Sequence, residues 1–177
     1  MKKIALLFAI ISIPLVVSAQ ESFDSFENEK DVTSVVVTKN MFKLLSKMDL
    51  NSQDPEVKDY LKMVDNLETI KIFTTDNPDV AARMSTKVKS YVASNKELSE
   101  LMRVKDDSKN IRFYSKQGAT ESLVSELLMH LDGVVDGETM TVVMSITGAI
   151  DLKQIGKLTQ ELKVPGSEQL ININIEN

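Results

Sequence analysis

His130 is the residue of this chain that most readily suggests catalysis, because an imidazole can act as a general base near neutral pH. It is the one histidine in the sequence, and there is no cysteine, so a catalytic triad or metal site would depend on a single ring. Ser125 and Glu126 lie near it, but side-chain alternation along a strand places Ser125 on the opposite face. We therefore expect His130 to be a structural or surface residue and assign no catalytic residue.

Clustered carboxylates offer a second kind of chemistry. Asp132, Asp136 and Glu138 could supply the oxygen ligands that calcium prefers. Their spacing matches no EF-hand loop, and glycine with aspartate is equally typical of a hairpin turn. We interpret the stretch DGVVDGE as a turn and assign no metal site. A carboxylate pair for glycoside hydrolysis stays open, since any two of the 26 acidic residues could converge.

Gly148, in the stretch ITGAID, could belong to a phosphate-binding turn in front of a helix. A single glycine is fewer than such loops use, and Asp151 would repel an anion while capping the helix itself. A helix cap is therefore the better interpretation. The nine methionines fall mostly on apolar faces, which is typical of an adaptable core and not of a copper site. The sequence thus indicates no cofactor.

The first 19 residues have the pattern of a secretory signal peptide. Lys2 and Lys3 precede an apolar run over residues 4–17, which is shorter than the roughly 20 residues that span a bilayer. Small residues end the segment and predict cleavage between Ala19 and Gln20. We expect an exported protein without a permanent membrane anchor, placed in the periplasm or, alternatively, secreted.

Composition narrows what the exported part, residues 20–177, can do. Its length suits one domain with a hydrophobic core large enough to be stable without disulfide or metal cross-links. The whole chain carries a net charge of −5, and the basic signal segment leaves the remainder more acidic, which opposes nucleic-acid binding. The lack of cysteine excludes disulfides, thiolate catalysis and lipid attachment to a cysteine. The oligomeric state stays open.

The order of strand and helix patterns predicts a single α+β domain. Runs rich in β-branched and aromatic residues predict strands at 32–38, 67–75, 98–105, 110–116, 122–131 and 139–147. Helical spacing and start signals predict helices at 40–48, from Pro55 onward, at 78–94 and after Asp151. We expect a mixed or antiparallel sheet, a β-meander in the C-terminal half, and helices packed on one face.

Two segments are ambiguous. Residues 122–131 carry leucines that fit a helix as well as a strand, and we favour the strand. Residues 170–176 read LININIE, with three isoleucines in strict alternation. This period of two predicts an added edge strand, or failing that, a segment that pairs with a partner.

Three stretches resemble the bacterial family known as domain of unknown function 4252: VTSVVVTKNMF, ELMRVKDD followed by IRFY, and VVMSITGAIDLKQIGKL. The resemblance spans residues 23–162 and is most specific at 148–151. It implies a small exported protein of the Bacteroidota, placed in the periplasm, with no catalytic residues to transfer. Members of the family often carry a lipid-attachment cysteine, from which this sequence departs.

These observations favour a non-enzymatic, exported binding or regulatory module of the cell envelope whose partner is another envelope protein. The alternatives are a small-ligand or lipid-binding domain with a methionine-lined pocket and a carboxylate-dependent envelope hydrolase. A flat exposed apolar patch would favour a protein partner. A closed apolar cavity would favour a ligand, and an open cleft with facing carboxylates would favour a hydrolase.

Overall fold

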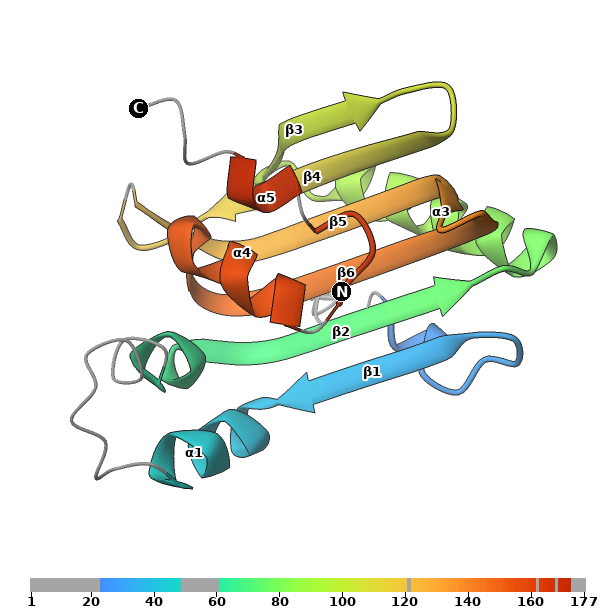
Figure 1. The fold of residues 1–177 in the computed structure, drawn as a ribbon. Coiled ribbons are helices and arrows are strands. Elements are labelled where there is room, and N and C mark those ends of the chain that lie inside the picture. Colours follow the sequence, from blue (N-terminus) through green and yellow to red (C-terminus); the bar gives the residue numbers. More distant parts are fainter. Residues whose placement is uncertain (1–22, 49–60, 121, 162, 168, 173–177) are drawn as a thin grey trace, which may run out of the picture.

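The computed structural model describes residues 23–48, 61–120, 122–161, 163–167 and 169–172 (Figure 1). The expected signal peptide with its cleavage site at Ala19, and the expected helix start at Pro55, lie outside these ranges. Six antiparallel strands form one sheet in the order β1-β2-β6-β5-β4-β3. Their bounds are β1 Thr33–Thr38, β2 Leu67–Thr75, β3 Leu98–Lys105, β4 Lys109–Gln117, β5 Leu123–Val135 and β6 Glu138–Asp151.

Helices lie on both faces of this sheet (Figure 1). The long helix α3 and the short 3-10 turn η2 cover one face. The opposite face carries the larger core and is covered by α1, a helical turn at residues 61–65, α4 and α5. The bounds are η2 Asp24–Phe26, α1 Lys39–Met48, α3 Pro78–Ser94, α4 Leu152–Glu161 and α5 Gln169–Asn172.

The α+β class and the C-terminal β-meander are confirmed, but the prediction that the helices pack on one face is wrong. The reason lies in the two central strands. Residues 126–131 of β5 and 141–146 of β6 are buried without interruption, so both strands present apolar groups to both sides. A sheet of this kind needs cover on each face, whereas a one-sided sheet shows alternation between buried and exposed residues.

The observed strands and helices agree closely with the predictions where the local sequence signals are strong. The bounds of β2, β3 and α3 are those predicted, and residues 122–131 form a strand, as favoured. β5 and β6 run further than predicted, up to a two-residue turn at Asp136 and Gly137. Their φ angles of 53° and 88° fit the type I′ turn that hairpins prefer. The turn interpretation of DGVVDGE is thus confirmed at Asp136 and Gly137, whereas residues 132–135 continue β5.

The predicted edge strand at the C-terminus is wrong where the structure describes it. Leu170 lies in the helical turn α5, and its side chain is 1% exposed in the larger core. The turn at residues 165–167 continues into this helix through hydrogen bonds from Ser167 to Val164 and from Leu170 to Ser167. These turns direct Leu170 onto the sheet face and away from its edge. Residues 173–177 lie outside the described ranges.

Candidate functional site

Helix α3 is placed by a capped start that is tied to the strands beside it. Asn77 caps the helix, and its side-chain oxygen accepts hydrogen bonds from the amides of Asp79 and Val80 at 3.0 and 3.3 Å. The Thr75 hydroxyl donates to the carbonyl of Asp31 at 2.6 Å, and the Asn77 amide donates to the Asp31 carboxylate at 3.1 Å. The chain before β1, the end of β2 and the start of α3 are thereby joined.

A cluster of polar side chains lies between α3 and the sheet. The Ser85 hydroxyl oxygen on α3 is 3.1 Å from Nε2 of His130 and 3.2 Å from each carboxylate oxygen of Asp132. Asp132 Oδ2 is itself 3.2 Å from His130 Nε2. Thr141 of β6 donates its hydroxyl proton to Asp132 Oδ1 at 2.6 Å. Asp132 therefore joins α3, β5 and β6.

The cluster has the residue types of a catalytic triad in a different geometry. In a triad, serine contacts one ring nitrogen and aspartate contacts the other. Here Ser85 and Asp132 both approach Nε2 of His130. Because the Ser85 hydroxyl donates to Asp132, we assign the tautomer in which Nε2 carries the proton and donates. With Nε2 protonated, His130 and Ser85 both donate within the cluster, and the arrangement fastens α3 to β5.

A second polar contact joins the C-terminal half of α3 to β5. The Tyr91 hydroxyl lies 2.8 and 3.0 Å from the two carboxylate oxygens of Glu126, which is 8% exposed. Burial raises the pKa of Glu126, opposed by the hydrogen bond from Tyr91 and by the charge of Lys116. Burial also raises the pKa of Tyr91, and the Glu126 charge adds to this, so the phenol keeps its proton and remains the donor.

His130 gives the stability of the protein a predictable pH dependence. Burial lowers the pKa of His130 from its ordinary value of 6.5, and the charge of Asp132 only partly opposes this. The unfolded chain therefore binds more protons than the folded one just below pH 6.5, so the free energy of unfolding rises with pH there. The His130 contribution is complete above that value and is lost as the pH falls. We expect His130→Gln to flatten the rise.

Urea unfolding of both proteins between about pH 5 and 8 checks this expectation, since that range brackets the ordinary histidine pKa. Glu126 has a raised pKa and gives the opposite slope above 4.5, but it is present in both proteins and cancels in their difference. Parallel stability curves for the two proteins would show that His130 titrates alike in the folded and unfolded states.

The sequence pointed to some residues that the fold does not bring to this cluster. Ser125 donates its hydroxyl to the carbonyl of Gln117 on β4 and not to His130. Asp136 and Glu138 form the end of the β5–β6 hairpin. Asp151 ends β6 directly before α4. In the described part of the chain, no three His, Cys, Asp or Glu side chains are grouped so as to hold a metal ion.

Sequence reasoning missed the partners of the polar cluster. Ser85 and Tyr91 come from α3, 45 and 35 residues from His130 and Glu126 in the chain. Thr141 is only nine residues from Asp132, but the contact depends on the register of the β5–β6 hairpin. One signal was available, because Glu126, His130 and Asp132 alternate with apolar residues in a strand that is otherwise buried. Buried polar groups such as Glu126 and His130 require hydrogen-bond partners from whatever covers that face.

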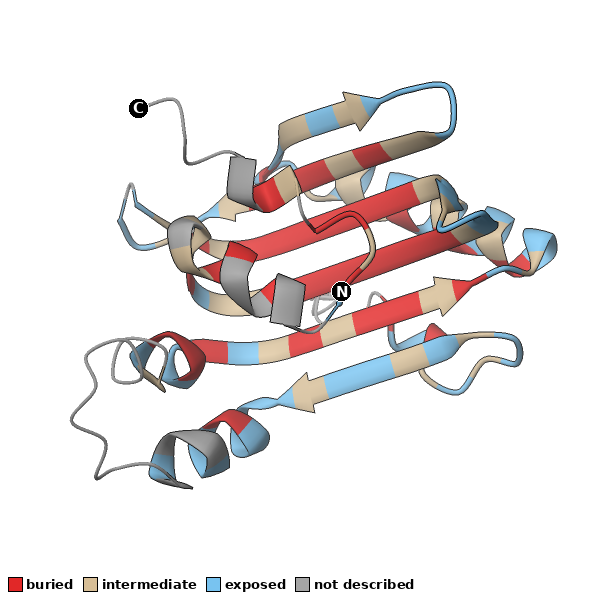
Figure 2. Ribbon diagram, in the orientation of Figure 1, coloured by how far each residue is buried: buried red, intermediate tan, exposed pale blue. Residues whose placement is uncertain are grey.

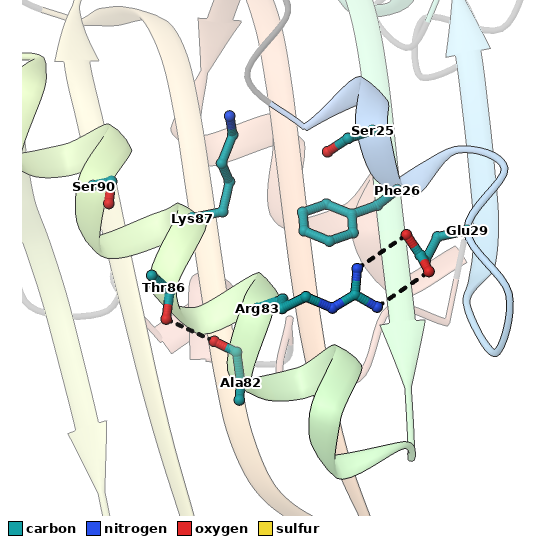
Figure 3. A pocket seen from close by; sticks show the side chains of 8 residues that line it. All are labelled: Ser25, Phe26, Glu29, Ala82, Arg83, Thr86, Lys87 and Ser90. Atoms are coloured by element: carbon teal, nitrogen blue, oxygen red, sulfur yellow. Dashed lines mark hydrogen bonds and ion pairs between the residues drawn. The ribbon is translucent and has the colours of Figure 1, made fainter.

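Two of the hollows on the surface are lined entirely by residues in the described ranges. The first, of about 470 Å³, lies between η2 and α3 (Figure 3). The second, of about 340 Å³, lies where β1 begins and β2 ends, and the carboxylates of Asp31, Asp76 and Glu138 line it. Neither hollow is lined by His130, Ser85 or Asp132, so the polar cluster faces neither of them.

Exposed apolar side chains gather at one edge of the sheet. Val35 and Val36 of β1 are 42% and 38% exposed, and Met41 and Leu44 of α1 are 47% and 56% exposed. Figure 2 shows this edge as the most exposed part of the sheet, next to strands that are buried along most of their length. β1 pairs with β2 on one side, and no other described strand lies beside its outer edge.

The fold and these surfaces define an α+β protein built on one open antiparallel sheet with helices on both faces. A family model described as Domain of unknown function (DUF4252) matches residues 26–158. The chain belongs to this family, and the resemblance noted in the sequence is confirmed. No curated protein and no solved structure matches the chain. Over the described ranges, no helix combines the length and the apolar character needed to cross a membrane.

Proposed function

We propose that this protein is a non-enzymatic binding module of the cell envelope that takes up an extended segment of a partner protein along β1. The observation that carries this proposal is the outer edge of β1, which pairs with no strand in the described ranges, together with the apolar side chains around it. An unpaired edge presents a row of backbone donors and acceptors that a partner strand can satisfy. Exposed apolar groups beside such a row add affinity when they are covered.

The two edges of the sheet differ in the features that normally prevent strand addition. The other edge strand, β3, carries exposed Glu100, Arg103 and Lys105, and its pairing with β4 is interrupted by an irregularity between Glu100 and Met102. Charged residues and bulges of this kind blunt an edge. β1 reads TSVVVT, has no charge, and pairs with β2 without interruption. The protein is thus protected against pairing at one edge and open to it at the other.

The residues of β1 indicate what the partner segment is like. Val35 and Val37 align with Ile72 and Ile70 on the face of the larger core, whereas Val36 aligns with Lys71 on the α3 face. An added strand would place every second side chain beside Val35 and the exposed α1 residues, so we expect apolar residues at those positions. The envelope location of this partner rests on the signal sequence expected over residues 1–19.

Affinity capture with an edge-blocking variant tests the proposal. Lysine is a residue that natural edge strands use against pairing, so Val35→Lys should abolish capture of the partner from native envelope extracts. Val134→Lys is the matched control. Val134 is 40% exposed, which is similar to the 42% of Val35, but it lies near the end of β5 and not on β1. Mass spectrometry should find one protein with the wild type and with Val134→Lys, and lose it with Val35→Lys.

Thermal unfolding of the three proteins checks that capture is lost without loss of the fold, since exposed substitutions usually change stability by no more than about 0.5 kcal/mol. Equal capture by Val35→Lys and the wild type would refute strand addition at β1.

A further inference from the structure

The hollow between η2 and α3 has the features of a ligand site that is separate from the β1 edge. Its volume of about 470 Å³ lies in the range of small-molecule sites. Phe26 closes it from below, where the ring is 4% exposed and packs on Phe73 with ring centroids 6.2 Å apart. Hydroxyl groups and long side chains line the rest: Ser25, Thr86, Ser90, Arg83 and Lys87.

Among the charged side chains around the hollow, the acidic ones are paired with Arg83 and Lys71, and Lys87 is not part of these pairs. Arg83 and Glu29 form a two-pronged ion pair, with nitrogen–oxygen distances of 3.1 and 3.2 Å (Figure 3). Asp24 and Glu27, from the same segment, are engaged by Lys71 of β2. Hydrogen bonds to them hold the pKa of Lys71 above its ordinary value although burial acts in the opposite direction. The acidic groups of this segment are therefore satisfied by cations other than Lys87.

Lys87 forms no ion pair or hydrogen bond with any residue in the described ranges. Figure 3 shows it extending from α3 beside the Phe26 ring, with Ser25 of η2 on the other side of the hollow. The Thr86 hydroxyl donates to the carbonyl of Ala82 at 2.8 Å and is occupied within the helix. A ligand would therefore meet one ammonium group, the hydroxyls of Ser25 and Ser90, and a surface of carbon atoms.

We infer that this hollow binds a small carboxylate that has an apolar body. The carboxylate would lie on Lys87 on the side of the Ser25 hydroxyl, and the body would cover Phe26 and Ala82. One unpartnered cation matches one negative charge, and the net charge of −5 on the whole chain disfavours a polyanion. Since none of the lining residues belongs to β1 or α1, this site is independent of the proposed strand addition.

Isothermal titration of the mature protein with sodium octanoate tests the inference. Octanoate should bind saturably at one site, and Lys87→Gln should weaken binding by about tenfold, because a charge-assisted hydrogen bond is lost. Lys89→Gln is the matched control, since Lys89 is an exposed lysine of the same helix that does not line the hollow. Ala82→Phe should abolish binding by filling the hollow while leaving Lys87 in place.

Further ligands separate the chemical groups that the site recognises. Octanol and acetate should each bind more weakly than octanoate, because one lacks the charge and the other lacks the apolar body. Equal binding of octanol and octanoate, or equal binding by Lys87→Gln and the wild type, would overturn the inference. Tighter binding of inorganic phosphate, or of a peptide through its free C-terminal carboxylate, would overturn the assignment to a small carboxylate. Circular dichroism confirms that each variant keeps its fold.

Discussion

Replacing Gly148 with alanine is expected to destabilise the protein by about 3 kcal/mol or more, from backbone strain and steric overlap together. Gly148 has a φ of 133°, in a region that residues with a Cβ rarely adopt. An added Cβ would lie 2.5 Å from the carbonyl oxygen of Asn66 and 2.8 Å from Cα of Leu67. The same oxygen accepts the amide of Ala149 at 2.9 Å, so it cannot move away without breaking a bond between β6 and the start of β2.

Gly137→Ala is the matched control for this prediction. Gly137 also has a positive φ, of 88°, but no atom lies within 4 Å of the position that its Cβ would take. Its replacement should cost only the strain of the turn, about 1–2 kcal/mol. Urea unfolding measures both variants. A loss for Gly148→Ala no larger than that for Gly137→Ala would mean that β6 and the segment before β2 can separate freely.

Phe73→Ala is expected to cost about 3–5 kcal/mol, the usual range for removing a fully buried phenylalanine. Phe73 is 0% exposed and lies on the α3 face of β2, in the smaller core with Phe26, Met84 and Val143. Its removal leaves a cavity under both η2 and α3. Val134→Ala, at a site 40% exposed, should change stability by no more than about 0.5 kcal/mol.

Thermal and urea unfolding of these two variants show whether the loss of stability comes from emptying a buried site or from replacing any apolar side chain by alanine. A cost below about 1 kcal/mol for Phe73→Ala would show that α3 can move in to close the cavity, because the cost depends on how far a site collapses. Since Phe26 rests on Phe73, the same variant should also weaken octanoate binding in the hollow above it.

Much of the fold could be predicted because its signals are local. Helix α3 starts with Asn77 as its cap and Pro78 in its first turn. Both signals are adjacent in the sequence and need no distant contact. The Asp136–Gly137 turn and the β-branched residues of β1 and β2 likewise act on their own neighbourhood. Such elements appear where the sequence predicts them. The position of one element relative to another could not be predicted in the same way.

The features on which the proposed function rests depend on strand order, which local patterns do not encode. β6 lies between β2 and β5, and this leaves β1 at one edge with its valines exposed. The contact of Ser85 with His130 joins residues 45 apart and exists only because α3 covers that face of β5. The tail prediction is wrong over residues 170–172, which form part of helix α5 and bury Leu170 in the larger core, a contact that the local alternation of isoleucines does not encode.

The most direct test of the account is photo-crosslinking in living cells from position 35. A photoreactive phenylalanine analogue at Val35 should give one discrete adduct with a partner protein, because this position borders the open edge of β1. The same analogue at Val134, which is exposed to a similar degree, should give none. Absence of an adduct at position 35, or the same adducts at both positions, would contradict the proposal that β1 is the binding edge.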